Sequence, residues 1–369
     1  MTLGSIPSIT NLVAANKKAK NMINRIKTCA IIFAFISVFS SCTKDKEIVT
    51  ELPFPLYGIG AKFEQNISYD TKSRTQFDIW WLSESSTPTG LVIYVHGGGF
   101  FSGDKDYVYE PQKGGQWDFP SDIRSFLNQG VAFATVRYTL FESSGIEQEG
   151  VKKPMNDVKR ALQYIRSRAE DFNLDKEKVV LTGNSAGAGT SLWIAFNDDM
   201  ADFGNSDPVL QESTRVKGVA VRETQSSYNI EDRWINDVFF DYGITWNDFV
   251  NANESKILQT YGVPSMAEYN TPAIDTYRDD VDMLSLFTAD DPAIWVDNTL
   301  REVPDTVPSG LDLTDDLIIN HHAFHARELK ERADFLGVEN ISYYGKNPIL
   351  CSDPSGETWV DFCIRKLNE

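Results

Sequence analysis

The sequence has few of the residues that usually supply acid–base and redox chemistry. It holds only four histidines and four cysteines in 369 residues. Cations are also scarce, with 35 Lys and Arg against 53 Asp and Glu, which gives a net charge of −18. Because so acidic a surface repels phosphate backbones, nucleic acid is excluded as an expected partner. An imidazole base can come only from four residues: His96, His321, His322 and His325.

The sequence also lacks an apolar run long enough to span a bilayer, which needs roughly 20 residues. The apolar run near the N-terminus covers only Ala30–Phe39. Residues 1–41 carry several Lys and Arg but no acidic residue, and a basic segment before a short apolar run is typical of a targeting signal. We therefore expect residues 1–41 to be a signal segment, with Met22 as the true start.

The signal segment ends in Ser40-Ser41-Cys42, which resembles the lipobox of a bacterial lipoprotein. The resemblance implies cleavage before Cys42 and lipidation of its thiol, so that the membrane is a partner through a lipid anchor. Residues 42–51 would be the lipidated tether. Within it, Lys44–Glu47 resembles the surface-export signal of lipoproteins in Bacteroides-like bacteria. The expected location is the periplasmic or cell-surface face of the outer membrane.

Internal repeats and Pro/Gly/Ser linkers are absent after the tether, so residues 52–369 are expected to form one domain. Short apolar runs alternate with stretches of helical spacing, a pattern typical of an α/β fold with a mostly parallel sheet and helices on both faces. Residues 67–81 alternate like antiparallel strands. Residues 225–290 break the pattern and predict an inserted cap or lid. The apolar runs are Leu91–Val95, Val131–Val136, Val179–Thr182, Val216–Arg222, Ala293–Val296 and Ile341–Tyr344.

The segment Gly183–Gly187, with the sequence Gly-Asn-Ser-Ala-Gly, directly follows one of these runs and precedes a helical stretch. A serine between a strand and a helix can be held in a strained turn that projects its hydroxyl, and the flanking glycines let the two elements pass closely. Ser185 is therefore the candidate nucleophile.

The segment His96–Phe100, with the sequence His-Gly-Gly-Gly-Phe, follows the first strong apolar run. Consecutive glycines allow backbone N–H groups to point into a site. Together with the N–H of Ala186, they can form an oxyanion hole.

These motifs are similar to those of the carboxylesterase branch of the α/β-hydrolase superfamily, which includes hormone-sensitive-lipase-like enzymes. The resemblance covers residues 60–220 well and 290–369 more loosely. It implies a serine esterase that needs no cofactor, with Ser185 as nucleophile and the N–H groups of Gly98, Gly99 and Ala186 as oxyanion donors. In that family the residue at His96 shapes the loop and is not the base. The resemblance rests on His96–Phe100, Val136–Tyr138, Asp157–Ile165 and Asn173–Gly187.

The base is missing from its usual place in that family, because the stretch after Ile341–Tyr344 holds no histidine. We predict His322 as a substitute base, with His321 and His325 as alternatives in the same short cluster. For the orienting acid we predict Glu302, with Asp297 and Asp305 as alternatives after the strand Ala293–Val296. No carboxylate or cysteine lies at a recognisable ligand spacing from the histidine pair, so no metal is expected.

The expected function is hydrolysis of carboxylic esters at Ser185, with glycan acyl groups such as acetyl or feruloyl as expected substrates. Two alternatives remain open at this point: a catalytically impaired binding protein and a serine peptidase. Cys351 and Cys363 could be bridged or free.

Overall fold

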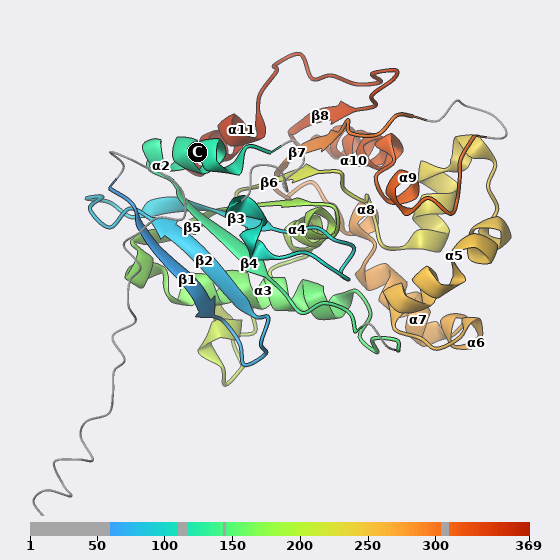
Figure 1. Ribbon diagram of the computed structural model, residues 1–369, viewed down its shortest axis with the longest axis horizontal. Coiled ribbons are helices and arrows are strands. Elements are labelled where there is room, and N and C mark those ends of the chain that lie inside the picture. Colours follow the sequence, from blue (N-terminus) through green and yellow to red (C-terminus); the bar gives the residue numbers. More distant parts are fainter. Residues whose placement is uncertain (1–59, 110–116, 143–144, 304–309) are drawn as a thin grey trace, which may run out of the picture. The chain divides into compact units, whose positions relative to one another are not determined.

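The computed structural model describes residues 60–109, 117–142, 145–303 and 310–369. The signal segment, the tether and Cys42 lie outside these residues. The centre of the described part is an eight-stranded sheet in the order β1-β2-β4-β3-β5-β6-β7-β8 (Figure 1). The strands are β1 (Lys62–Ser68), β2 (Gln76–Trp81), β3 (Thr89–Val95), β4 (Ala132–Arg137), β5 (Leu174–Asn184), β6 (Gly218–Arg222), β7 (Ala293–Asn298) and β8 (Asn340–Tyr344).

The prediction of a mostly parallel sheet is confirmed. Strands β4, β3, β5, β6, β7 and β8 pair in parallel, whereas β1 with β2 and β2 with β4 pair antiparallel. The parallel strands are buried on both faces, which explains why they are continuous apolar runs. Parallel pairing also brings the C-terminal ends of β3, β5, β6 and β7 to one edge, where ligands bind in open α/β sheets.

The helices begin where the apolar spacing changes from strand to helix period. They are η1 (Lys105–Tyr109), α2 (Phe119–Asn128), α3 (Lys152–Ser167), η2 (Ala169–Phe172), α4 (Ala186–Phe196), η3 (Pro208–Gln211), η4 (Ile230–Val238), η5 (Phe240–Tyr242), α5 (Trp246–Tyr261), α6 (Met266–Tyr269), α7 (Pro272–Asp280), α8 (Met283–Leu286), α9 (Asp316–Asn320), α10 (Ala323–Leu336) and α11 (Trp359–Asn368).

Two apolar layers cover the sheet. Alternate residues of β3 enter different layers, because successive side chains of a strand point to opposite faces. Leu91, Ile93 and Val95 pack with α3, α4, α8 and α10, while Val92 and Tyr94 pack with α2 and α11. Figure 1 shows α2 and α11 together on one side of the sheet and α3 on the other.

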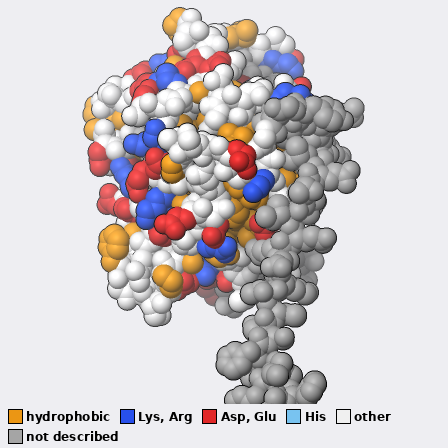
Figure 2. Space-filling view, turned by 90° about the vertical axis from the view of Figure 1, so that its left-hand side faces the viewer, with side chains coloured by type: hydrophobic (Ala, Val, Ile, Leu, Met, Phe, Trp, Pro, Cys, Tyr) orange, Lys and Arg blue, Asp and Glu red, His pale blue; other side chains and the backbone are white. Residues whose placement is uncertain are grey.

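Residues 225–290, where the sequence predicts an inserted cap, hold only helices and loops in the structure, from η4 to α8. They connect β6 to β7, and α5, α6 and α7 lie together at the right of Figure 1. Within the described residues, no helix has both the length and the apolar character needed to cross a membrane. Acidic and basic side chains are interspersed over the face that Figure 2 shows. Cys351 and Cys363 are both free.

Candidate active site

Ser185 lies at a strained turn between β5 and α4. Its backbone has φ 52° and ψ −122°, a left-handed conformation that a residue with a side chain rarely adopts. Its N–H donates to the carbonyl oxygen of Arg222 at 3.0 Å, which ties the turn to the end of β6. The structure therefore places Ser185 in the conformation that the sequence motif predicts.

The two glycines of the motif have the packing role that the sequence suggests. A Cβ atom on Gly187 would lie 2.1 Å from the carbonyl oxygen of Val95, and one on Gly183 would lie 2.6 Å from the carbonyl carbon of Gly187. Real Cβ contacts are longer, so any side chain here would push α4 away from the sheet. The close approach keeps the N-terminus of α4, with its unpaired N–H groups, directly behind Ser185.

The glycine-rich loop after β3 turns sharply beside Ser185. Gly98, Gly99 and Phe100 all have positive φ, at 114°, 61° and 66°. Gly99, Ser185 and Ala186 line the same cavity, and the N–H groups of Gly99 and Ala186 have no acceptor among the described residues. These two amides can therefore stabilise a developing oxyanion.

Gly98 contributes to this loop in a different way from Gly99. Its carbonyl oxygen accepts hydrogen bonds from the N–H groups of Phe101 at 3.0 Å and Ser102 at 3.1 Å. It is not among the residues that line the cavity. Through its carbonyl, Gly98 closes the turn that presents Gly99, while its own N–H has no acceptor among the described residues, so its role as an oxyanion donor stays a prediction.

His96 holds the glycine-rich loop in place through its contacts with Gly97 and Tyr138. Its ring stacks on Tyr138 with the centroids 4.2 Å apart, and its Nδ1 lies 2.7 Å from the carbonyl oxygen of Gly97. Burial lowers the pKa of His96 to about 4, so the ring is neutral and Nδ1–H donates to Gly97. Tyr138 in turn donates its hydroxyl to the His96 carbonyl at 2.9 Å. This is the loop-shaping role that the family resemblance implies.

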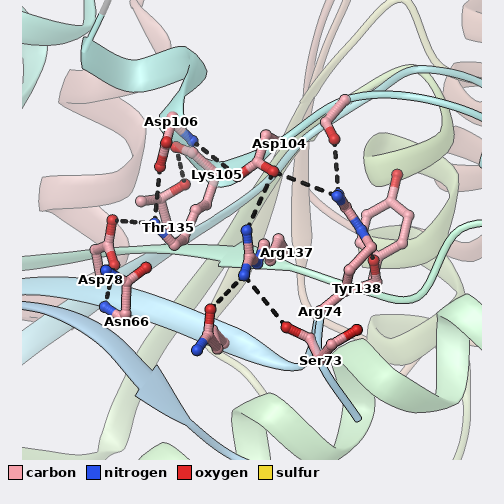
Figure 3. Close-up of polar contacts among 12 residues, drawn as sticks. Asn66, Ser73, Arg74, Asp78, Asp104, Lys105, Asp106, Thr135, Arg137 and Tyr138 are labelled. Carbon is pink, nitrogen blue, oxygen red and sulfur yellow. Dashed lines mark hydrogen bonds and ion pairs between the residues drawn. The ribbon is translucent and has the colours of Figure 1, made fainter.

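Figure 3 shows a cluster of charged residues, Arg74, Asp104 and Arg137, beside Gly103 at the end of the glycine-rich loop. Arg74 donates to the carbonyl oxygens of Gly103 at 2.8 Å and Tyr138 at 3.0 Å. Asp104 lies between Arg74 and Arg137, 3.4 Å from each guanidinium. Because Arg74 joins the loop to the residue after β4, the cluster fixes the loop against the sheet.

A buried ion pair continues this cluster. Lys105 Nζ lies 2.7 Å from Asp78 Oδ2, and both side chains are almost fully buried. Thr135 donates its hydroxyl to the carbonyl oxygen of Lys105 at 3.0 Å, and the N–H of Asn66 donates to the second Asp78 oxygen at 2.6 Å. With both carboxylate oxygens satisfied, this pair anchors the segment that follows the loop.

His321 is the histidine that the structure brings to Ser185. Its Nε2 lies 2.8 Å from Ser185 Oγ. The residue caps the C-terminal end of α9, and its backbone N–H donates to Leu317 at 3.2 Å. Its Nδ1 is buried without a partner among the described residues. Burial, together with the charges of Arg301 and Lys256, lowers the pKa of His321 to about 4.

The predicted base, His322, faces away from Ser185, and this corrects the prediction. Its Nδ1 accepts the N–H of Phe324 at 3.2 Å, so His322 caps the N-terminus of α10. With Nδ1 as acceptor, its Nε2 carries the proton and donates to the hydroxyl of Tyr242 at 3.0 Å. The short helix α9 ends at Asn320, so neighbouring histidines point in different directions.

His325 has a third set of partners. Its Nδ1 lies 3.2 Å from the backbone N of Ser226, and its Nε2 lies 3.0 Å from the carbonyl oxygen of Ile319. No group of three or more His, Cys, Asp and Glu in the described part of the chain is arranged to hold a metal ion. The three histidines of the cluster thus have different hydrogen-bond partners.

The structure does not bring the predicted acid, Glu302, to the base. Glu302 is exposed, and its carboxylate accepts from Asn347 Nδ2 at 3.0 Å. The alternative Asp297 is engaged by the N–H and hydroxyl of Thr299, at 3.2 and 2.6 Å, and by Arg222 at 3.4 Å. Asp305 lies outside the described residues. The prediction of Glu302 is thus corrected, and no residue in the described part of the chain pairs with Nδ1 of His321.

Sequence reasoning missed Glu223, the residue that follows β6. It is buried, has φ 50°, and its Oε1 accepts the N–H of Leu300 at 2.9 Å. Its Oε2 is buried and has no partner within the described parts of the chain, and burial raises the pKa of its carboxyl to about 8. The available signal was an acidic residue directly after a buried parallel strand, the same signal that drew attention to the end of the strand Ala293–Val296.

A cavity of about 130 Å³ opens in front of Ser185. Aromatic and aliphatic side chains form most of its wall, and the insertion between β6 and β7 supplies nearly half of the lining. Lys256 pairs with Asp316 at the wall. The lining residues are Gly99, Phe100, Phe101, Phe141, Val151, Ser185, Ala186, Gln225, Tyr228, Ile230, Trp234, Lys256, Gln259, Thr260, Asp316 and Asn320.

Parts of the chain are similar to proteins of known sequence and structure. A segment of 102 residues is 29% identical to gut esterase 1 of Caenorhabditis elegans, and one of 75 residues is 33% identical to endo-1,4-beta-xylanase B of Butyrivibrio fibrisolvens. These segments cover 27% and 20% of this chain but only 16% and 12% of the relatives, so the chain matches a small part of each.

Two solved structures share the fold. A truncated carbohydrate esterase from gut microbiota superposes with a TM-score of 0.54 at 16% identity, over 83% of this chain and 96% of that one. A bifunctional GH43-CE protein of Bacteroides eggerthii gives 0.52 at 17% identity, over 82% of this chain and 38% of that one.

The family comparison covers the part of the chain that builds most of the site. The BD-FAE family model matches residues 77–283, more than half of the 369 residues. The match includes the glycine-rich loop, the Ser185 turn, Glu223 and most of the cavity wall. The chain therefore belongs to the BD-FAE family of α/β-hydrolase-fold esterases.

Proposed function

We propose that this protein is a serine carboxylic-ester hydrolase with Ser185 as its nucleophile. The observation that carries the proposal is the distance of 2.8 Å between Ser185 Oγ and His321 Nε2. A serine hydroxyl is a weak nucleophile until a neighbouring base accepts its proton, and this distance is within hydrogen-bond reach. Burial keeps His321 neutral near pH 7, which is the form that can accept that proton.

The reaction proceeds in two halves. Ser185 Oγ attacks the ester carbonyl while its proton moves to His321 Nε2, and the N–H groups of Gly99 and Ala186 stabilise the tetrahedral oxyanion. The intermediate breaks the bond to the leaving oxygen, and His321 protonates the departing alcohol. Water then attacks the acyl-enzyme, gives its proton to His321, and the acid is released as Ser185 regains that proton. Each proton is carried by His321, so the proposed reaction needs no cofactor.

We propose acyl groups on glycans, such as acetyl or feruloyl, as the substrates. The names of two structural neighbours, a carbohydrate esterase and a GH43-CE protein, support this class. So does the relative named as a xylanase. The cavity wall adds a physical reason, because Phe101, Tyr228 and Trp234 offer apolar rings beside the nucleophile.

The expected surface location extends this proposal. Cys42 would carry the lipid that holds the enzyme on the outer membrane, close to polymeric substrate. Labelling of expressing cells with a palmitate analogue should mark the wild-type protein, and Cys42→Ser should remove the label. Equal labelling of the variant would contradict lipidation at this thiol.

Steady-state hydrolysis by the full chain tests the enzymatic proposal. We expect turnover of p-nitrophenyl acetate, release of acetate or ferulate from acylated xylan, and loss of both in Ser185→Ala. A folded wild-type protein that binds these compounds without turnover would instead support the binding-protein alternative. Cleavage of a peptide amide in preference to the esters would support the peptidase alternative.

A further inference from the structure

Glu223 is a buried carboxyl that the proposed reaction does not yet use. It is 5% exposed, and its φ of 50° is one of a few positive values at residues other than glycine. Such a conformation costs free energy and persists where the surrounding structure enforces it, often at functional sites. Here the backbone N–H of Glu223 donates to the backbone carbonyl oxygen of Asp297 at 2.9 Å, and the backbone N–H of Leu300 donates to Glu223 Oε1. Both contacts hold the carboxyl at the C-terminal end of β6.

The chain around Glu223 connects the nucleophile to the base. The carbonyl of Arg222 accepts the N–H of Ser185 at 3.0 Å, one residue before Glu223. Gln225 Nε2 donates to the carbonyl of Asn320 at 2.8 Å, one residue before His321. Glu223 thus lies in the chain between Arg222, which contacts Ser185, and Gln225, which contacts the residue before His321.

Glu223 Oε2 and His321 Nδ1 are both buried without a partner among the described residues, and the same holds for Nε of Arg301. For His321 to accept a proton at Nε2, its neutral ring must carry hydrogen on Nδ1, so this atom is a donor. Glu223 Oε2 is an acceptor once the carboxyl is ionised: burial raises its pKa to about 8 in the free protein, and a hydrogen bond from Nδ1–H together with the charge of the imidazolium lowers that pKa in the complex. A buried donor and a buried acceptor left unpaired each cost free energy, and pairing them would remove both costs.

The charge of Arg301 affects both His321 and Glu223. Its charge lowers the pKa of His321 and also that of the Glu223 carboxyl. The charge of Lys256 also lowers the pKa of His321. The pKa of Glu223 is lowered by Arg222 and raised by Asp297. The charges of Arg301 and Lys256 both disfavour the imidazolium that forms during catalysis. An ionised Glu223 would supply the missing negative charge.

We propose, on the basis of the proposed function, that Glu223 is the acidic positioning residue of this site and accepts the Nδ1–H of His321 when substrate fills the cavity. The hydrogen bond fixes the tautomer that places the Nε2 lone pair on Ser185 Oγ, and it stabilises the imidazolium. Hydrogen bonds of this kind often tighten only in the complex. Glu223 therefore acts through His321 and does not touch the substrate.

The test is Glu223→Gln in the full chain, assayed with p-nitrophenyl acetate. Glutamine has the same shape and keeps an oxygen for the N–H of Leu300, but it carries no charge. We expect kcat to fall about 10²- to 10⁴-fold, the range seen when the acid of a serine triad is replaced, with KM little changed. Glu223→Asp should recover part of this loss.

The pH profile separates a positioning role from a structural one. An ionised Glu223 raises the pKa of His321 in the substrate complex, and the pH dependence of kcat reports that complex, so the acid limb of kcat should move to lower pH in Glu223→Gln. The matched control is Asp291→Asn, another buried carboxyl, which lies at the opposite edge of the sheet before β7. It should leave both kcat and the acid limb unchanged.

The proposal is overturned if Glu223→Gln keeps kcat within about threefold of wild type, or if it loses activity with an unmoved acid limb. These results are distinct from failure of the proposed function, which would show as wild-type turnover that Ser185→Ala does not reduce. Should Glu223→Gln not fold, proton NMR of the phosphonylated wild type decides. A strongly downfield His321 Nδ1 proton supports the pairing, and an ordinary ring N–H shift overturns it.

Discussion

The ring of His325 joins the turn that carries His321 to the segment after β6. Its Nε2 lies 3.0 Å from the carbonyl oxygen of Ile319, and its Nδ1 accepts the N–H of Ser226. The ring is fully buried, and burial lowers its pKa to about 3, so it is neutral; Nδ1 also lies 3.1 Å from the hydroxyl of Ser226, and both nitrogens are paired. A residue that touches no substrate therefore sets the position of the proposed base.

His325→Ala should lower the free energy of unfolding by about 2–4 kcal/mol, because it leaves a buried carbonyl and a buried N–H unpaired and opens a void. Urea denaturation at pH 7 measures the change. Phe335→Ala on the same helix serves as the control, since Phe335 is 81% exposed and should change stability little. A His325→Ala protein as stable as the control would show that these contacts contribute nothing.

Replacement of the two neighbouring histidines should have opposite outcomes. His321→Ala removes the proton acceptor, and we expect kcat/KM to fall by about 10³-fold or more. His322→Ala removes a helix cap and the contact with Tyr242, so it should cost about 1–2 kcal/mol of stability while the folded protein keeps most of its rate. Ester hydrolysis and urea denaturation of both variants check this. The assignment is wrong if His322→Ala is the less active variant.

Gly98→Ala tests whether the glycine-rich loop presents its amides to the site. A Cβ at this position would lie 2.2 Å from the carbonyl oxygen of Ser102, so the loop must move. We expect kcat to fall about 10²-fold or more as the amide of Gly99 is displaced. Gly130→Ala is the matched control, because Gly130 also has positive φ but has free space around it. That variant should lose about 1 kcal/mol of stability and keep its activity.

Stability should fall as the pH drops from about 6.5 toward 4. His96, His321 and His322 have pKa values lowered to about 4 by burial, and His325 to about 3. Above the ordinary histidine pKa, the histidines are neutral in both the folded and the unfolded state, so they do not change the free energy of unfolding. Below it the unfolded chain takes up protons that the folded protein refuses, which costs up to about 1.4 kcal/mol per histidine and pH unit.

Several buried carboxyls oppose this trend. Burial raises the pKa of Asp122 to about 6 and that of Glu223 to about 8, so each keeps its proton in the folded state and favours that state at low pH. Asp78, Asp291 and Glu328, whose pKa values burial also raises, act in the same direction, and together these groups offset part of the histidine effect. Urea midpoints at pH 7.0, 6.0 and 5.0 should therefore fall progressively. A midpoint independent of pH over this window would contradict the assignment of buried neutral histidines.

The sheet and the nucleophile could be predicted from the sequence because their signals are local. Apolar runs of four to seven residues define the parallel strands. Gly183–Gly187 and His96–Phe100 each need glycine at fixed positions for close packing or positive φ. Such motifs encode their own geometry, so the turn at Ser185 followed from a few adjacent residues.

The base and the acid could not be predicted in the same way, because tertiary contacts decide them. His321 and His322 differ only in lying on either side of the break between α9 and α10, and the N-cap at Asp315 was the one local sign of α9. Glu302 matched a position in a loop, but the loop carries its side chain to the surface beside Asn347. Glu223 has no motif, and only the fold places it between Ser185 and the turn at Asn320.

The most direct test of the central claim is covalent labelling of the full chain with a fluorophosphonate, followed by mapping of the modified residue by mass spectrometry. Such reagents react with a serine whose hydroxyl has been activated by a base. We expect a single phosphonylated peptide containing Ser185, with no label in Ser185→Ala and strongly slowed labelling in His321→Ala. A folded wild-type protein that stays unlabelled, or a label on another serine, would contradict the claim that Ser185 and His321 form the reactive pair.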